Sequence, residues 1–374
     1  MTTPKESLVG KATPLAVNDF DHLEYFVGNA KQSAFFFRFA LGFDIVAYRG
    51  PETGTRETVS YVLKQNDIKL IITGAFLPEH PVTEHVRKHG DGVNAVAFKT
   101  ADAFGDYEKA MARGAESVQE PTTIEDEHGT VKTAAIKAYG DTIHRFIERE
   151  GYKGTFLPGF RDLYLPSPNR AGLIRIDHIV ANVGWNEMET WVEYYERIFG
   201  FFQFRHFDEN DISTEFTALR SKVMASPTLG IKLPINEPAE GRKRSQIEEY
   251  VDFYQTPGVQ HAAITTADIL STVRQLRANG IEFQTVPGSY YDTLLDRVGP
   301  IREDVEILRD LGILVDKDDS GYLLQIFTKP IQDRPTFFFE IIQRMGSESF
   351  GKGNFKALFE SIERDQAARG TLDK

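Results

Sequence analysis

The chain has 374 residues, of which 41% are hydrophobic and 26% are charged, with a net charge of −12 and no cysteine. This length predicts two domains, and the lack of cysteine excludes disulfides, thiolate zinc sites, iron–sulfur clusters and a cysteine nucleophile. The negative charge argues against a nucleic-acid partner, because a phosphate backbone would repel the average surface. The sequence has no apolar run near the roughly 18–20 residues that span a bilayer, and "MTTPKESLVG" has no apolar signal segment. We therefore expect a cytoplasmic protein with no membrane partner.

The first half of the chain begins with an alternating apolar strand, "DFDHLEYFV", which contains His22. Asn29 is a favourable N-cap and Gly42 a favourable stop, so a helix is predicted between them. Period-two patterning in "ETVSYVLKQ" and "IKLIITG" then predicts short strands. A further strand at "GV" (Gly92-Val93), a second helix and more strands complete this half.

The second half repeats the same order. Its first strand, "RIDHIVANV", places His178 where the first copy has His22, and a helix is predicted from about Asn186 to Gly200. Farther on, "TPGVQHAAITTADILSTVRQLRANGIE" matches "GDGVNAVAFKTADAFGDYEKAMARGAE". A repeat longer than about 100 residues indicates duplicated domains rather than a solenoid.

This duplication predicts two modules, an N-terminal one at residues 1–155 and a C-terminal one at 156–374. A Gly- and Pro-rich stretch at 151–172, "GYKGTFLPGFRDLYLPSPNRAG", joins them. Its Phe and Tyr residues predict that it packs against the protein rather than forming a free linker.

The two copies differ in their potential metal ligands. The second copy has His261 where the first has Ala95, and a strand near the end of each copy carries a glutamate, Glu340 and Glu148. The second copy thus holds two histidines and a glutamate on three strands. The first copy lacks the middle ligand, and we interpret it as a structural relic whose His22 has no assigned role.

A polar side chain on the core face of a strand is costly without a partner. A divalent cation would satisfy His178, His261 and Glu340 together. Two imidazoles and one carboxylate leave coordination positions open, as in non-haem iron(II) enzymes that use dioxygen. A bidentate 2-keto acid would neutralise the remaining positive charge and leave one position for dioxygen. A zinc hydrolase is the alternative reading, although no general base is evident beside the site.

Strict alternation places two neighbours of these ligands away from the metal. Asp177 is expected on the opposite face of its strand, with a structural role. Gln260 is also expected to point away, so either Pro257-Gly258 distorts the start of the strand or Gln260 acts on the site without touching the metal. His85 and His89 could share one face of a helix, and the interleaved charges favour a solvated helix over a metal site.

The second copy is also rich in aromatic residues. "LLQIFTKP" places Gln325 and Phe327 on one face, and a pocket with aromatic walls and a few amides suits an aromatic substrate with a polar end. In "FGKGNF" two glycines precede Phe355, which begins an apolar helical face. This pattern predicts a C-terminal helix that either docks on the core or closes over the substrate as a lid.

Taken in order, "IDHIVANV", "LPINEPAEGRKRSQI", "GVQHAAI", "DRPTFFFEIIQR" and "FGKGNFKALFESIE" resemble the 4-hydroxyphenylpyruvate dioxygenases of the vicinal-oxygen-chelate superfamily. The resemblance implies an α+β fold of two tandem modules, each built from paired βαβββ units forming an open barrel, with a C-terminal lid helix. It implies Fe(II) bound by His178, His261 and Glu340. It implies catalytic contributions from Ser221, Asn236, Gln246, Gln260 and Gln325. It implies substrate binding by Pro234, Phe327, Phe338, Phe350, Asn354, Phe355 and Leu358.

The reaction implied is oxidative decarboxylation of 4-hydroxyphenylpyruvate by dioxygen, with ring hydroxylation and side-chain migration to homogentisate, as in tyrosine breakdown. One alternative is 4-hydroxymandelate synthase, which acts on the same substrate, although Pro234 and Asn236 with Phe350 and Phe355 fit the ring-hydroxylating pattern. A second alternative is a non-catalytic ligand-binding member of the superfamily, which would have no reason to keep the three ligands. We expect the protein to be a homo-oligomer.

Overall fold

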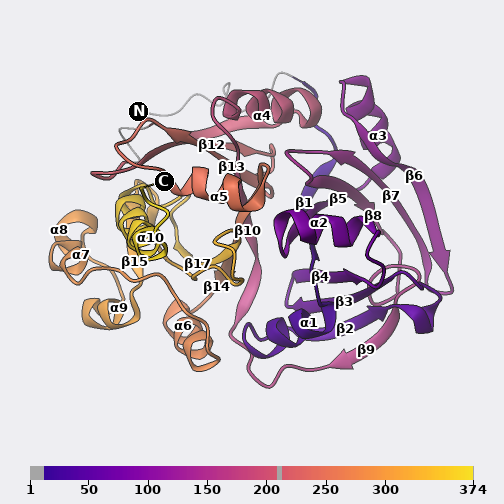
Figure 1. Ribbon diagram of the computed structural model, residues 1–374, viewed down its shortest axis with the longest axis horizontal. Coiled ribbons are helices and arrows are strands. Elements are labelled where there is room, and N and C mark those ends of the chain that lie inside the picture. Colours follow the sequence, from indigo (N-terminus) through magenta and orange to yellow (C-terminus); the bar gives the residue numbers. More distant parts are fainter. Residues whose placement is uncertain (1–11, 209–212, 374) are drawn as a thin grey trace.

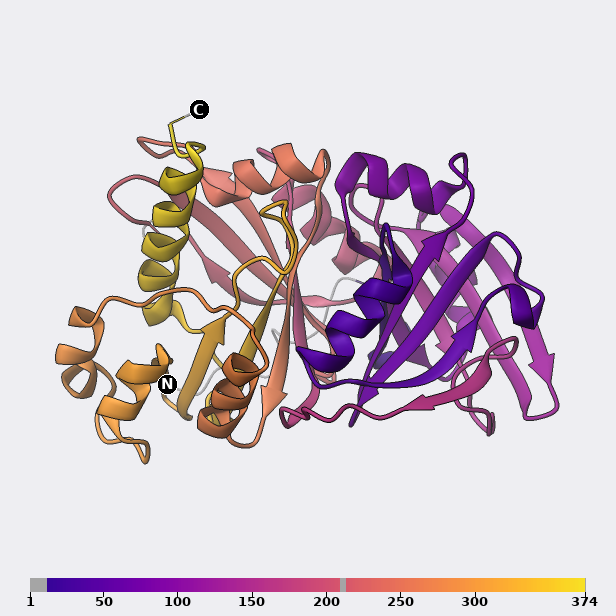
Figure 2. The same cartoon turned by 60° about the horizontal axis from the view of Figure 1, so that its bottom comes forward.

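The computed structural model describes residues 12–208 and 213–373, which form two strongly curved sheets lying side by side (Figures 1 and 2). Residues 1–10, in which no signal segment was expected, lie outside the described residues. Within the described part of the chain, no helix is both long and apolar enough to cross a membrane.

The N-terminal sheet has the strand order β6-β7-β8-β5-β1-β4-β3-β2-β9 among the described residues. Its strands are β1 (Val17–Phe26), β2 (Asp44–Arg49), β3 (Thr58–Gln65), β4 (Ile68–Ala75), β5 (Gly92–Thr100), β6 (Ser117–Asp126), β7 (Gly129–Lys137), β8 (Ile143–Glu148) and β9 (Arg161–Leu165). Its helices are α1 (Ala30–Phe39), the short η2 (Pro51–Thr53), α2 (Pro81–His89) and α3 (Ala103–Ala112).

The C-terminal sheet has the order β11-β12-β13-β10-β14-β17-β16-β15 over the same described ranges. Its strands are β10 (Leu173–Asn182), β11 (Phe202–Phe207), β12 (Ala218–Ala225), β13 (Lys232–Ala239), β14 (Gly258–Thr266), β15 (Leu314–Asp318), β16 (Gly321–Phe327) and β17 (Phe338–Met345). Its helices are α4 (Met188–Tyr194) continued by η3 (Tyr195–Phe199), α5 (Gln246–Tyr254), α6 (Ile269–Ala278), α7 (Ser289–Asp292), α8 (Leu294–Val298), α9 (Val305–Leu311), η4 (Lys352–Asn354) and α10 (Phe355–Arg369).

Each sheet is built from two βαβββ units, which confirms the predicted fold class, and the N-terminal sheet also has β9 at its edge. In the N-terminal module β1 pairs in parallel with β4 of its own unit and antiparallel with β5, the first strand of the second unit. In the C-terminal module β10 makes the same two pairings with β13 and β14. The first strands of both units therefore lie at the centre of each sheet.

Local sequence signals fix several helix ends. The Asn29 side chain accepts a hydrogen bond from the backbone of Gln32, so it caps α1 as predicted. In the second module the helix begins at Met188, two residues later than expected, because Asn186 has a left-handed backbone. Gly200 is left-handed and ends that helix as predicted.

The stretch that joins the modules packs into the N-terminal one. Phe156 is 1% exposed and clusters with side chains of β2, β3 and β4, so its aromatic content does anchor it. The following β9 pairs with β2 and belongs to the N-terminal sheet. The division at residues 155 and 156 stays a prediction.

The helix that carries His85 and His89 lies between the modules. Both imidazoles are buried, at 6% and 0% exposure, and His89 stacks on Tyr254 of α5 at 4.3 Å. The expectation of a solvated helix was therefore wrong for this face, since the two histidines fill the contact between α2 and α5. Glu84 and Arg87 on the outer face are exposed and pair with each other.

A segment between α6 and β15 distinguishes the two modules. In the N-terminal module α3 ends at Ala112 and β6 begins at Ser117, whereas in the C-terminal module α6 ends at Ala278 and β15 begins only at Leu314. The additional residues form α7, α8 and α9. We call residues 279–313 the inserted segment.

Candidate active site

Three neighbouring strands of the C-terminal sheet bring one side chain each to the same point. His178 lies on β10, His261 on β14 and Glu340 on β17. Their Nε2 atoms lie 3.2 Å (His178) and 3.4 Å (His261) from Glu340 Oε2, and the three potential ligand atoms lie within 4.8 Å of one another. All three residues are buried. The donor set fits one divalent cation bound by two imidazoles and a carboxylate.

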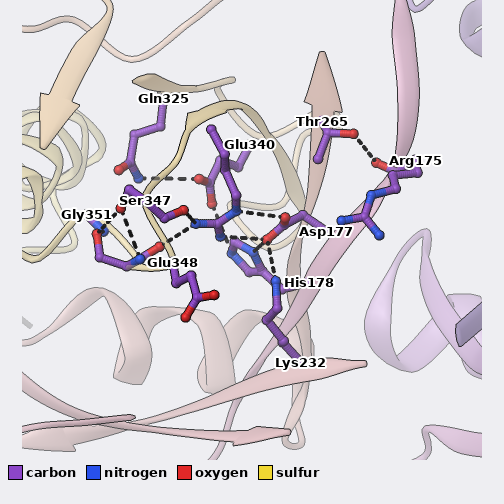
Figure 3. Close-up of polar contacts among 12 residues, drawn as sticks. Arg175, Asp177, His178, Lys232, Thr265, Gln325, Glu340, Ser347, Glu348 and Gly351 are labelled. Carbon is purple, nitrogen blue, oxygen red and sulfur yellow. Dashed lines mark hydrogen bonds and ion pairs between the residues drawn. The ribbon is translucent and has the colours of Figure 1, made fainter. Parts of the chain in front are cut away.

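A carboxylate and an amide hold the far sides of the two imidazoles. Asp177 Oδ1 lies 2.8 Å from His178 Nδ1, and Gln260 Oε1 lies 2.9 Å from His261 Nδ1. Each oxygen accepts the Nδ1 proton, which directs the Nε2 lone pair of both rings toward a metal. Arg344 holds Asp177 through two hydrogen bonds of 2.9 and 2.7 Å. Figure 3 shows Asp177 beside His178, with Glu340 on the other side of the imidazole.

The position of Asp177 contradicts the alternation expected of a strand. In the pairing of β10 with β14, Ile176 faces Ile264 while His178 faces Ala263, so Asp177 is the extra residue of a β-bulge. A bulge re-aims a side chain and is common beside active sites. The expectation that Asp177 points to the opposite face, with a purely structural role, was wrong, because its carboxylate supports His178.

A second bulge explains Gln260. On β14, His261 faces Val180 while Val259 faces Ala181, so Gln260 is the extra residue. Its side chain lines the same cavity as His261. Strict alternation therefore fails here as well. The start of the strand is distorted, and Gln260 also acts on the site through His261, so both options that the sequence left open are observed.

Charges around the triad favour metal binding. Burial acts to raise the pKa of Glu340, but the adjacent imidazoles outweigh burial and lower that pKa to about 2. Burial acts to lower the pKa of His178, yet Glu340 and Asp177 outweigh it and raise this pKa above its ordinary value. Burial lowers the pKa of His261. The lowered pKa values keep Glu340 ionised and His261 neutral, which are the forms in which these side chains bind a metal.

The triad opens into a cavity of about 550 Å³. Every residue predicted for the site lines this cavity except Asn354, which lies behind Gln325 and donates to its Oε1 at 3.0 Å. Aromatic rings surround the ligands: Phe338 stacks on His261 at 4.8 Å, and Phe350 contacts His178 edge-on at 5.1 Å. The catalytic and substrate-binding roles of these residues stay predictions.

Sequence reasoning missed some of the cavity wall. The missed residues are Val180, Phe207, Leu219, Val223 and Phe359. A signal for two of them was present, because Leu219 and Val223 alternate with the predicted Ser221 along β12 and share its face. Phe359 follows Phe355 by one helical turn.

The described residues of the N-terminal module form no such triad, and the strand register shows why. In the pairing of β5 with β8, Ala95 faces Ile143 as His261 faces Phe338 in the second module. Glu340 follows Phe338 by two residues, and Arg145 follows Ile143 by two residues, so Arg145 is the counterpart of Glu340. The assignment of Glu148 to that position was wrong.

The register instead matches Glu148 with Gln343. Each accepts a hydrogen bond from the first backbone N–H of the helix in its own βαβββ unit, Ala103 of α3 at 3.0 Å and Ile269 of α6 at 2.8 Å. This shared contact shows that both side chains are helix supports. The first module thus offers one histidine, an alanine and a guanidinium at the three ligand positions, with Phe156 packed edge-on against His22 at 5.3 Å.

Comparison with known proteins agrees with this architecture. Residues 12–160 match the family described as hydroxyphenylpyruvate dioxygenase, N-terminal, and residues 175–326 match the glyoxalase/bleomycin resistance protein/dioxygenase superfamily. A 4-hydroxyphenylpyruvate dioxygenase of Neurospora crassa is 48% identical over 95% of this chain and 93% of the relative. One of Xenopus tropicalis is 48% identical over 94% of this chain and 92% of the relative. The chain belongs to the 4-hydroxyphenylpyruvate dioxygenase family.

A solved structure is also similar along nearly the whole length. It is a substituted 4-hydroxymandelate synthase from Streptomyces coelicolor, with a TM-score of 0.83 and 31% identity, covering 95% of this chain and all of that one. Members of the dioxygenase family depend on a metal, and the present chain supplies the His-His-Glu set for it.

In this dioxygenase-family chain, a line of amides continues behind the carboxylate ligand. Gln325 Nε2 donates to Glu340 Oε1 at 3.3 Å, and Asn354 Nδ2 donates to Gln325 Oε1. Glu340 Oε2 is the oxygen that faces the imidazoles. The two carboxylate oxygens thus have different partners, which orients the group toward the metal position.

Proposed function

We propose that the chain converts 4-hydroxyphenylpyruvate and dioxygen into homogentisate and carbon dioxide with Fe(II) held by His178, His261 and Glu340. The observation that carries the proposal is the buried triad at the wall of an aromatic cavity, in a chain 44–48% identical to curated dioxygenases over 94–99% of its length. The equation balances without another reductant, because one oxygen atom enters the ring and the other completes the new carboxylate.

A ferrous ion at this site would supply the chelation of the 2-keto acid and the activation of dioxygen. The chain's own side chains bind and orient the substrate. Phe338 and Phe350 flank the ligands and exclude water from them. Ser221, Asn236 and Gln246 present polar groups to the substrate's oxygen atoms. Phe355 and Leu358 on α10 close the cavity as a lid.

A second candidate is the conversion of the same substrate to 4-hydroxymandelate, favoured by the similarity to the solved synthase. Its identity of 31% is lower than the 44–48% shared with dioxygenases, so we place it second. A non-catalytic binding protein is the third candidate, and the complete triad argues against it.

The test is product identification. Metal-free protein is incubated with ferrous iron, ascorbate and 4-hydroxyphenylpyruvate in air, with oxygen uptake recorded and products separated chromatographically. Because homogentisate and 4-hydroxymandelate have the same elemental composition, retention and fragmentation must distinguish them. We expect homogentisate. A 4-hydroxymandelate product would move the assignment to the second candidate, and no iron-dependent uptake would favour the third.

Two variants make the result specific to the triad. Glu340→Gln should abolish turnover because the carboxylate ligand is lost. Arg145→Gln changes the counterpart position of the N-terminal module and should leave turnover within about twofold, since surface or half-buried polar changes usually have small effects. The cytoplasmic location and the homo-oligomeric state stay predictions.

A further inference from the structure

From Phe283 onward, the inserted segment 279–313 has no counterpart in the first module, and Tyr290 connects it to the triad. Tyr290 on α7 lies 2.6 Å from Asn354 Oδ1 and also contacts the backbone of Val315. Asn354 is 1% exposed and immediately precedes α10. The tyrosine therefore joins a segment found in one module to the start of the helix that closes the cavity.

The direction of these hydrogen bonds follows from counting protons. The backbone N–H of Val315 donates to the Tyr290 hydroxyl at 2.8 Å. The carbonyl of Val315 accepts from Arg297 at 3.0 Å, so it has a donor without the tyrosine. The single hydroxyl proton of Tyr290 is thus available to Asn354 Oδ1. Burial raises the pKa of Tyr290 to about 12, so the hydroxyl keeps that proton at neutral pH.

From Asn354 the donors continue in one direction to the metal ligand. Asn354 Nδ2 donates to Gln325 Oε1 at 3.0 Å, and Gln325 Nε2 donates to Glu340 Oε1 at 3.3 Å. Gln325 and Glu340 are 1% and 3% exposed. In a buried site of this kind, each hydrogen bond polarises the next, and an unpaired member is costly.

The same part of the fold holds the turn before α10. The backbone N–H of Gly353 donates to Asp316 Oδ2 at 3.0 Å, and Asp316 pairs with Arg297 of α8 at 3.5 Å. The Arg297 guanidinium also lies over the Tyr290 ring at 4.9 Å. The inserted segment and the strand that follows it, β15, therefore hold the start of α10 through several contacts, in addition to the contact of Asn354 with Gln325 on β16.

We propose that Tyr290 is a positioning residue that ties the start of the lid helix to the metal ligand Glu340 through Asn354 and Gln325. The inserted segment then serves to couple occupation of the metal site to closure of α10. Metal binding orders Glu340, the amide line transmits that order to Asn354, and Phe355 is held over the cavity. This inference rests on the proposed function for the identity of the site and adds Tyr290, a residue outside the cavity lining, together with the route that links it to Glu340.

The experiment compares Tyr290→Phe with Tyr291→Phe in the full chain. Tyr291 is the adjacent residue of the same helix, and its buried hydroxyl has no hydrogen-bond partner within residues 12–208 and 213–373. Both substitutions remove one hydroxyl and keep the ring, but only the first breaks the line to Glu340. Cobalt(II) binding, followed by its visible absorption, and hydrogen exchange of residues 350–358 with and without cobalt are measured alongside kinetics.

We expect Tyr290→Phe to weaken cobalt binding by about 3- to 10-fold. Residues that hydrogen-bond a metal ligand directly contribute about 10- to 100-fold to metal affinity, and Tyr290 acts through two intervening amides. Cobalt should slow exchange at residues 350–358 in the wild type and in Tyr291→Phe, and this protection should be lost in Tyr290→Phe. The KM for the keto acid should rise more than kcat falls, because the lid is displaced while the ligands remain.

Equal cobalt affinity and equal protection in the two variants would overturn the inference, even if the wild type is fully active. Loss of protection in Tyr290→Phe together with an inactive wild type would support the coupling and refute the proposed reaction. The two ideas therefore fail separately.

Discussion

Replacement of Asp177 by asparagine isolates the support behind His178. The Asp177 side chain is 0% exposed and that of Arg344 17% exposed, so the change leaves a largely buried guanidinium without its counter-charge. Breaking such a pair costs about 3–5 kcal/mol. Two features reduce this cost: Arg344 also donates to the carbonyls of Ser347 and Ser349, and asparagine keeps an acceptor oxygen. We therefore expect Asp177→Asn to lower the free energy of unfolding by about 2 kcal/mol.

The effect on the metal is separate from the effect on stability. A neutral amide polarises the His178 imidazole less than a carboxylate does, and partners of this kind contribute about 10- to 100-fold to metal affinity. We therefore expect Asp177→Asn to weaken cobalt(II) binding by at least about tenfold. The stability change is measured by urea unfolding of the metal-free protein, so that metal binding does not contribute to it.

The N-terminal module offers a matched control. Asp21 contacts His22 at 2.6 Å and pairs with Arg149, with the same order of residues and the same burial, but His22 belongs to no triad. Asp21→Asn should lose a similar free energy of unfolding and leave cobalt affinity unchanged. If both variants lose stability and neither loses affinity, the idea that Asp177 prepares His178 for the metal is refuted.

Three further outcomes follow from the site. Gly351 has a φ of +78°, and a Cβ there would overlap the Gln325 amide, so Gly351→Ala should cut kcat/KM at least about tenfold. The control Gly159→Ala, also at positive φ but in open space, should change only the stability of the protein. Equal kcat/KM values for the two variants would contradict the placement of Gln325. Because the pKa of His178 is raised, a metal ion must displace the proton of this imidazole. Cobalt affinity should therefore rise with pH above about 6.5, by up to about tenfold per pH unit. A cobalt affinity that is independent of pH between about 6 and 8 would contradict the raised pKa of His178. Deletion of residues 350–374 should abolish turnover, measured by oxygen uptake, while the protein still binds iron, measured by its iron content. Full activity of the truncated protein would refute the proposed role of α10 as a lid.

The sequence was sufficient to find the ligands because each is a costly polar residue on the core face of an apolar strand. His178, His261 and Glu340 needed no knowledge of register, only the expectation that three such residues share a partner. The lid helix was predicted for a similar reason, since the spacing of its apolar residues after Phe355 is local information.

What the sequence did not reveal depends on pairing between strands. Asp177 and Gln260 support the histidines only because bulges insert one extra residue on each strand. Pro257-Gly258 gave a local sign of the bulge at Gln260, but no such sign accompanied the one at Asp177. The match of Glu148 with Glu340 failed because the inserted segment changes the distance along the chain, and only the strand register identifies Arg145. Tyr290 could not be found either, because it lies 64 residues from Asn354 in the sequence.

The most direct test of the account is anomalous X-ray diffraction at the iron edge from crystals grown with ferrous iron under anaerobic conditions. We predict one anomalous peak per chain, within bonding distance of the Nε2 atoms of His178 and His261 and of Glu340 Oε2. A peak at His22 or elsewhere, or no peak at the triad in a catalytically active preparation, would contradict the central claim.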